Sequence, residues 1–377
     1  MIQQTAREFA RKELAPVAIE ANEKGVFPDE IFKQLGALGF MGMMLPEEYG
    51  GVHLGSFCLA LALEEVSAVC ASTGVTMSVH NSLTNMTILK YGSETLRKRY
   101  LPRLASGEIL GAYAITESEA GSDVAAMRLS ASRKGSDYIL NGTKIFISTG
   151  DRAGAIIVFG RTDPKDRTRG ISAFVVEPSF DGFSIGKTEK KMGLKASTTV
   201  ELVFEDCRVP AENLLGQEGA GMKIALAGLD GGRIGIAAQS VGIAQAALEE
   251  ALRYSRERKQ FNSRVIDFQS TRWKIADMAT AIEASRLLMY RAARGRDAGE
   301  AVSKEASMAK LFASRTANQV VFDALQMHGG VGYTEDFLIE RLFRDARVTE
   351  LYEGTSEIQR LVISRAVIEE FERTIPD

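Results

Sequence analysis

The period of the hydrophobic pattern changes twice along this chain of 377 residues, and this change limits the fold more than any other feature. Residues 1–107 have the composition and spacing of helices, residues 108–215 form short β-rich runs, and residues 216–377 return to the helical period. Helices and strands bury their apolar faces with different periods, so the three stretches need separate layers. We therefore predict a multidomain α+β protein with an N-terminal helical domain, a middle β-barrel or sandwich domain and a C-terminal four-helix bundle.

Helix-breaking residues divide the first domain into short helices. The breaks fall at Pro28, at the Pro-Glu-Glu-Tyr-Gly-Gly run of residues 46–51 and at the Tyr-Gly-Ser run of residues 91–93. Ser93 can act as an N-cap, with Glu94 in the first turn, where a negative charge is favourable. A helix is therefore predicted to begin there.

The middle domain contains five runs with the residue types of β-strands. Asn141-Gly142 lies between the first two and predicts a type I′ hairpin turn, because both central residues of that turn need positive φ. The five runs are Tyr138–Leu140, Lys144–Ser148, Ala155–Phe159, Ile171–Val176 and Thr199–Phe204. The glycine-rich residues 216–221 follow, and we interpret them as a linker turn because they lack the spacing of a dinucleotide loop.

Long amphipathic helices are predicted in the last domain, because apolar residues recur there on single helical stripes. A bundle is the usual way to bury several such stripes at once. Two of the stripes are formed by Ile234, Val241, Leu248 and Leu252, and by Ile275, Ala279 and Ile282.

Composition argues against several classes of protein. A formal net charge of -3 provides no basic surface for nucleic acid, and no stretch approaches the roughly 18 apolar residues of a membrane span. The first residues do not have the pattern of a secretory signal, so we expect a cytoplasmic protein. Ordinary thiols and no metal site are expected, because the cysteines and histidines lack ligand spacing: Cys58, Cys70, Cys207, His53, His80 and His328.

One candidate for chemistry is the segment Leu-Tyr-Glu-Gly-Thr-Ser-Glu-Ile-Gln-Arg at residues 351–360. Ser356 and Gln359 form a capping-box pattern, so a helix should begin here and leave Glu353 in the loop before it. The carboxylate would then lie near free backbone N–H groups, and Gly354 would permit close approach of a ligand. A surface glutamate before a capped helix is the alternative.

A second candidate is residues 112–123, which bring hydroxyl groups, small residues and Gly121 together at the start of the β region. Such a loop suits hydrogen bonding to a flat polar ring with close backbone approach. An ordinary acidic turn has the same composition and is the alternative.

The two segments together resemble the signatures of acyl-CoA dehydrogenases. Ala-Ile-Thr-Glu-x-x-Ala-Gly-Ser-Asp at residues 114–123 and Tyr-Glu-Gly-Thr-Ser-Glu-Ile-Gln-Arg at residues 352–360 are in the family's order and spacing. The segments at 141–148, 229–236, 258–261 and 326–333 agree as well, so the resemblance covers essentially the whole chain. It is greatest to the short-chain, butyryl-type members.

This resemblance implies FAD as the cofactor and assigns residues to it. Those matching flavin contacts are Tyr113, Ala114, Ile115, Thr116, Ser122, Phe146, Ile147 and Ser148. Positions that hold the pyrophosphate and adenosine, partly from a neighbouring subunit, are matched by Arg258, Gln269, Gln326, Met327, His328, Gly329 and Gly330. Further FAD contacts are implied for Thr355, Ser356 and Glu357.

The resemblance also implies the substrate site. The CoA ester would contact Ser122, Asp230, Arg233 and Gly354, and Glu353 would be the catalytic base. Some relatives carry the base on the helix that holds Arg233, but Gly232 occupies that position here. Glu353 is therefore the expected base.

The implied reaction is FAD-dependent α,β-dehydrogenation of a short-chain or branched acyl-CoA to a trans-2-enoyl-CoA. Glu353 would remove the α-proton, hydride would pass to flavin N5, and the backbone N–H of residue 353 with a flavin ribityl hydroxyl would bind the thioester oxygen. An electron-transferring flavoprotein is the expected acceptor and a homotetramer the expected assembly. The alternatives are an acyl-CoA oxidase or flavin monooxygenase on the same fold, and a non-catalytic scaffold.

Overall fold

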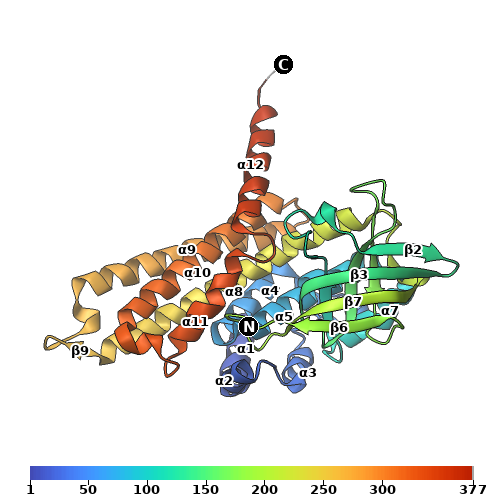
Figure 1. Ribbon diagram of the computed structural model, residues 1–377. Coiled ribbons are helices and arrows are strands. Elements are labelled where there is room, and N and C mark those ends of the chain that lie inside the picture. Colours follow the sequence, from blue (N-terminus) through green and yellow to red (C-terminus); the bar gives the residue numbers. More distant parts are fainter. Residues whose placement is uncertain (376–377) are drawn as a thin grey trace.

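The computed structural model describes residues 1–375, in which a helical region, a sheet and a second helical region follow one another (Figure 1). The element type changes between Ala105 and Leu110 and again between Leu215 and Gly221. The predicted order of domains is thus confirmed. Among the described residues, no helix is both long and apolar enough to cross a membrane.

Short helices make up the N-terminal domain. Ser93 caps α7 by accepting a hydrogen bond from the Leu96 N–H at 3.3 Å, and α3 begins directly after Pro28, both as predicted. The elements are α1 (Ile2–Phe9), η1 (Ala10–Leu14), α2 (Ala15–Lys24), α3 (Asp29–Ala37), η2 (Glu47–Tyr49), α4 (Gly55–Val69), α5 (Ala71–Ser78), η3 (Val79–Asn85), α6 (Met86–Tyr91) and α7 (Glu94–Ala105).

The middle domain is one mixed eight-stranded sheet with the order β6-β7-β3-β2-β4-β5-β8, and β1 pairs in parallel with β4. Among residues 1–375 the path is open, with β6 and β8 at its ends, but the sheet bends on itself: the rings of Tyr138 on β3 and Phe174 on β5 lie 4.8 Å apart. The strands are β1 (Leu110–Ala114), β2 (Ser130–Lys134), β3 (Asp137–Ser148), β4 (Ala153–Arg161), β5 (Ile171–Val176), β6 (Phe183–Thr188), β7 (Thr199–Pro210) and β8 (Leu214–Leu215).

The predicted hairpin turn at Asn141-Gly142 is wrong. Strand β3 continues through both residues, and the pairing with β7 shifts register between Leu140 and Gly142, where the glycine has φ of 138°. The positive-φ residue is therefore used in a bulge rather than a turn. The side chain of Asn141 and the backbone N–H of Asp206 on β7 form a 2.8 Å hydrogen bond across this bulge.

Long helices dominate the C-terminal domain, in which α8, α9, α10 and α11 pack together and α8 also packs on α4. Ile234, Val241 and Leu248 are buried, as their stripe predicts. The elements are α8 (Gly221–Glu257), β9 (Lys259–Gln260), β10 (Ser263–Arg264), η6 (Val265–Asp267), α9 (Gln269–Asp297), α10 (Ser303–His328), η7 (Gly329–Tyr333), α11 (Leu338–Arg347), η8 (Val348–Glu350) and α12 (Ser356–Glu372), while the short turns η4 (Val124–Ala126) and η5 (Ala211–Asn213) belong to the middle domain.

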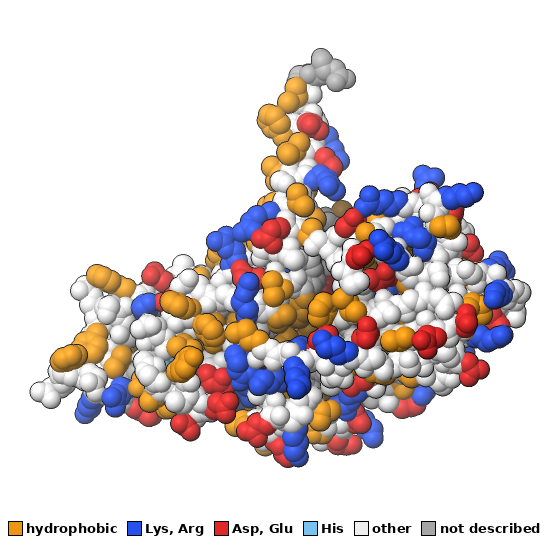
Figure 2. Space-filling view, viewed as in Figure 1, with side chains coloured by type: hydrophobic (Ala, Val, Ile, Leu, Met, Phe, Trp, Pro, Cys, Tyr) orange, Lys and Arg blue, Asp and Glu red, His pale blue; other side chains and the backbone are white. Residues whose placement is uncertain are grey.

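Helix α12 leaves the body of the molecule and projects away from it (Figure 1). Hydrophobic side chains lie along one side of the projecting helix (Figure 2), and the exposed ones are Leu361, Val367, Ile368 and Phe371. An apolar face of this kind on an isolated helix is typical of a surface that contacts another protein chain.

Candidate functional site

The loop before α12 carries the predicted base. Helix α12 begins at Ser356, as expected, but its N-cap is Thr355, whose hydroxyl accepts from the Ile358 N–H at 3.4 Å. The predicted capping box of Ser356 and Gln359 is therefore wrong by one residue. Gln359 instead donates from Nε2 to the carbonyl oxygens of Glu353, at 3.1 Å, and Gly354, at 2.8 Å.

Glu353 has an unusual backbone conformation. Its φ is 53° and that of Gly354 is 87°, both in the left-handed region, which is unfavourable for a residue with a side chain such as Glu353. Such a conformation persists only when surrounding contacts hold it, and it is concentrated at functional sites. Here the two bonds from buried Gln359 hold the loop, so the direction of the Glu353 side chain is fixed.

The Glu353 side chain points at the middle of α8. A Cβ atom added to Gly232 would lie 2.3 Å from Glu353 Oε2, so the carboxylate occupies the space that any larger residue would fill. Oε2 is shielded from solvent and has no hydrogen-bond partner within residues 1–375. Burying a carboxylate oxygen without a hydrogen-bond partner costs folding free energy, so its retention indicates a functional role.

The electrostatics of the pocket suit a base. Burial raises the pKa of Glu353 to about 7, while the nearby charges of Arg233 and Lys310 lower it and so limit the rise. A carboxyl group with a pKa near neutral pH is both a stronger base than one in water and still ionised in a large fraction of molecules.

Tyr113 reaches the same face of α8 from strand β1. A Cβ atom on Gly228, one helical turn before Gly232, would lie 3.1 Å from the Tyr113 hydroxyl. This hydroxyl is also buried and lacks a hydrogen-bond partner in the described chain. The structure thus brings two unpaired polar groups, from the β domain and from the loop before α12, to neighbouring glycines of one helix.

The two predicted flavin segments lie side by side. The Ile145 N–H donates to the Thr116 carbonyl at 2.9 Å, which joins the end of β1 to the end of β3. Phe146 has φ of 58° and is 59% exposed, an unusual placement for an aromatic ring inside a strand. A flat ring ligand against this segment would cover it, so these residues fit FAD.

A buried ion pair supports this corner of the sheet. Lys144 Nζ donates to Glu117 Oε1 at 2.7 Å and to the Ile115 carbonyl at 3.2 Å. Glu117 also accepts from the backbone N–H groups of Arg128 and Leu129 at 2.6 and 3.1 Å. The loop after β1 is therefore anchored from both sides.

The predicted substrate residues are only partly brought together. Arg233 is buried, and its Nη1 donates to Asp230 Oδ1 at 3.0 Å, while Asp230 Oδ2 accepts from the Ser303 hydroxyl at 2.5 Å. Asp230 and Arg233 lie on α8, and the Arg233 charge is close enough to Glu353 to lower its pKa, whereas Ser122 is exposed in the loop after β1.

The other predicted cofactor residues fall into two places. Thr355, Ser356 and Glu357 are at the start of α12, next to the base. The second set lies at the far end of the bundle, where His328 stacks on Tyr254: it comprises Arg258, Gln269, Gln326, Met327, His328, Gly329 and Gly330. Arg258 follows Gly232 by 26 residues along α8, which is about 39 Å at 1.5 Å per residue.

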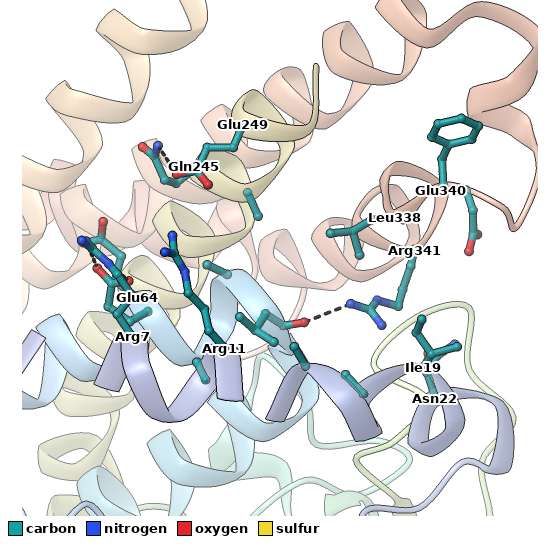
Figure 3. Close-up of a pocket in the computed structure, with 18 of the residues that line it drawn as sticks. Arg7, Arg11, Ile19, Asn22, Glu64, Gln245, Glu249, Leu338, Glu340 and Arg341 are labelled. Carbon is teal, nitrogen blue, oxygen red and sulfur yellow. Dashed lines mark hydrogen bonds and ion pairs between the residues drawn. The ribbon is translucent and has the colours of Figure 1, made fainter. Parts of the chain in front are cut away.

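A cavity of about 990 Å³ lies elsewhere, between the N-terminal helices and the bundle (Figure 3). Arg7 and Arg11 line one side and Arg341 of α11 another, and neither Glu353 nor Tyr113 borders it. Ion pairs cross it or lie at its edge, for example Arg286 with Glu64 at 2.8 Å. We interpret it as a groove between domains, because its lining comes from the N-terminal helices and the bundle and includes none of the predicted catalytic or cofactor residues.

Two features of the site were not predicted from the sequence. One is the presence of Lys310, and the other is the role of Gln359 in anchoring the loop. Lys310 is fully buried on α10, and its Nζ donates to the Gly354 carbonyl at 2.8 Å. The available signal was a lysine on an alanine stripe, because Ala306, Ala309 and Ala313 flank it at helical spacing and are all buried.

Comparison with known proteins shows which family this chain is similar to. Three family models match the chain: "Acyl-CoA dehydrogenase, N-terminal domain" over residues 1–108, "Acyl-CoA dehydrogenase, middle domain" over 112–207 and "Acyl-CoA dehydrogenase, C-terminal domain" over 219–368. Together they span all three structural regions.

Individual relatives are similar over nearly their full length. The short-chain specific acyl-CoA dehydrogenase of Clostridium acetobutylicum is 48% identical over 97% of this chain and 96% of its own. An acryloyl-CoA reductase (NADH) of Anaerotignum propionicum is 47% identical over 98% of this chain and 94% of its own. The structure of butyryl-CoA dehydrogenase from Megasphaera elsdenii superposes with a TM-score of 0.95 at 42% identity, covering 97% and 98% of the two chains.

Proposed function

The chain belongs to the acyl-CoA dehydrogenase family, and we propose that it oxidises a short-chain or branched acyl-CoA to a trans-2-enoyl-CoA with FAD as cofactor. The observation that carries the proposal is the carboxylate of Glu353, held by a strained loop in a buried pocket with no partner among residues 1–375. A non-catalytic scaffold would have no use for this costly arrangement.

In this proposal Glu353 removes the α-proton of the thioester. The α-proton is weakly acidic, so the negative charge that develops on the thioester oxygen must be stabilised, and the backbone N–H of Glu353 would donate to that oxygen. Losing one such donor commonly raises the activation barrier by about 3 kcal/mol. When bound, FAD supplies the acceptor for the hydride and its two electrons.

Residues of this chain would hold both ligands. Thr116 and Ser148 would donate to or accept from the flavin, with Phe146 against its ring, and Arg233 would lie beside the thioester. Tyr113 and Glu353 approach the pocket from two domains, and the Tyr113 hydroxyl and Glu353 Oε2 are both shielded from solvent, which would help to keep water from the reacting carbon atoms.

The test is anaerobic mixing of the purified yellow protein with a panel of acyl-CoA esters, from C4 to C16 and including branched and aromatic ones. We expect the flavin absorbance to bleach fastest with a short or branched ester. A protein without bound flavin, or a flavin that no ester bleaches, would contradict the proposal. Oxygen consumption during turnover would identify the oxidase alternative, and NADPH-dependent oxygenation the monooxygenase.

Reduction of a 2-enoyl-CoA is a second candidate for the physiological direction. The chain is almost as similar to the acryloyl-CoA reductase as to the short-chain dehydrogenase, at 47% and 48% identity. Both directions need the same base and acid at Glu353, because a residue that accepts the α-proton also returns it. Measuring the flavin potential with and without bound product would distinguish them.

The rate of flavin reduction should rise with pH and then level off. Because burial raises the pKa of Glu353 to about 7, the base is protonated and inactive below that pH and ionised above it. We therefore expect the single-turnover rate to fall about tenfold per pH unit below 7 and to level off above it. Stopped-flow measurement from pH 5.5 to 9 checks this, and a flat profile would contradict it.

The second set of cofactor residues supports an assembly of several copies. Arg258 lies about 39 Å along α8 from Gly232, so it cannot complete the pocket of its own chain and would serve a neighbouring one. We propose a homotetramer that includes the apolar face of α12, to be tested by sedimentation. The same proposal includes an electron-transferring flavoprotein as the acceptor and a cytoplasmic location. The acceptor is tested by measuring whether the reduced enzyme reduces the purified flavoprotein without an added redox dye. The location is tested by cell fractionation.

A further inference from the structure

We propose that Lys310 is a positioning residue for the base: its ammonium group holds the Gly354 carbonyl and places a positive charge in the pocket of the Glu353 carboxylate. The inference rests on the proposed function, in which Glu353 is the base. It concerns a residue on α10, an element that carries none of the predicted substrate contacts.

The first observation is the hydrogen bond from Lys310 Nζ to the Gly354 carbonyl, at 2.8 Å. Gln359 Nε2 donates to the same oxygen from the α12 side, also at 2.8 Å. The carbonyl that follows the strained residue is thus held by two buried side chains from different helices. Losing the charged donor would free the peptide to relax toward a conformation without positive φ.

The second observation is the burial of the lysine itself. The side chain is inaccessible to solvent, yet its ammonium group, with three N–H donors, makes only one hydrogen bond within the described part of the chain. A methionine would fill the same space without the cost of burying a charge. The charge therefore has a role beyond packing.

That role follows from the charges around it. Glu353 from the loop, Glu350 from η8 and Glu357 from α12 attract the ammonium group, and Arg233 from α8 repels it. Around the Glu353 carboxylate, both neighbouring charges are positive, from Arg233 and Lys310. Arg233 already pairs with Asp230, so Lys310 is the cation of the two that has no paired carboxylate of its own in residues 1–375.

Two opposing effects then set the basicity of Glu353. Burial raises its pKa, and the two cations lower it, with a net value of about 7. Without Lys310 the ionised form of Glu353 would be less stable and its pKa would be higher. In a larger fraction of enzyme molecules Glu353 would then be protonated, and therefore inactive, at neutral pH.

The test is Lys310→Met in the FAD-loaded enzyme, with the pH profile of flavin reduction as the readout. We expect the midpoint of the profile to move upward by about one pH unit, as loss of one nearby charge predicts. Lys310→Arg, which keeps the charge, should restore most of the wild-type midpoint. Lys304→Met is the matched control, because Lys304 lies on the same helix and pairs with Glu370, and it should leave the midpoint unchanged.

A second readout does not depend on turnover. In protein with ¹³C-labelled glutamate carboxyl groups, the signal that disappears in Glu353→Gln identifies residue 353, and its titration should shift upward in Lys310→Met. An unshifted titration and an unshifted rate profile would overturn the inference. If wild-type flavin is not reduced by any acyl-CoA, the proposed function fails instead, and the carboxyl titration still decides whether Lys310 acts on Glu353.

Discussion

Glu353→Gln is expected to keep FAD bound and to reduce the rate at which acyl-CoA bleaches the flavin by about 10²- to 10⁴-fold, the usual contribution of a positioned general base. The amide has the shape of the carboxylate, so the loop held by Gln359 and Lys310 should not change. What is lost is the ability to accept a proton. Stopped-flow absorbance with a C4 ester measures the effect directly.

The control for this variant is Glu369→Gln on the same helix. Glu369 is exposed near the end of α12, thirteen residues after the first residue of the helix, Ser356, and it is not among the predicted cofactor or substrate residues. It should bleach at nearly the wild-type rate with an unchanged pH profile. Equal rates in wild type and Glu353→Gln would remove Glu353 from the reaction and leave the pocket without a base.

The sequence predicts the layout of this protein well, because the change in hydrophobic period reflects which faces are buried. Strand β5 coincides with the predicted run Ile171–Val176, and α7 begins after Ser93 as its capping residues indicate. These features depend on local patterns of a few residues. They need no knowledge of what packs against them.

Predictions failed where tertiary contacts decide the outcome. Asn141-Gly142 has the residues of a tight turn, but β7 pairs with both flanking runs, so the glycine forms a bulge instead. Ser356 and Gln359 match a capping box, yet Gln359 is drawn to the carbonyl groups of residues 353 and 354. In both cases a partner distant in sequence, or a strained loop, outweighed a local preference.

The chemistry of the site shows the same division. Glu353 can be singled out from the sequence because it lies in a recognisable signature. Lys310 could not, because a single lysine on a helix is usually solvated and only the packing of α10 against the loop buries it. Tyr113 was expected at the flavin, but its placement opposite Gly228 depends on how the sheet meets α8.

Gly232→Ala is expected to leave the fold intact and to impair the reaction strongly. Alanine is favoured over glycine inside a helix by up to about 1 kcal/mol, so α8 should be as stable or more stable. The added Cβ, however, would lie 2.3 Å from Glu353 Oε2, well inside contact distance. The atom in the way is the end of a flexible side chain, so the carboxylate moves rather than the backbone.

A displacement of about 1 Å relieves that overlap, and a misplacement of this size can cost about 10²-fold in rate. We therefore expect a variant with normal flavin content and an unchanged or higher melting temperature, but flavin reduction slower by about two orders of magnitude. The decisive comparison is a double-mutant cycle. If alanine acts by displacing the base, then adding Gly232→Ala to Glu353→Gln should cause little further loss, because the group it displaces no longer accepts a proton. A full additional 10²-fold loss would mean that the methyl group blocks the substrate itself, and the space beside Gly232 would then belong to the thioester rather than to the carboxylate.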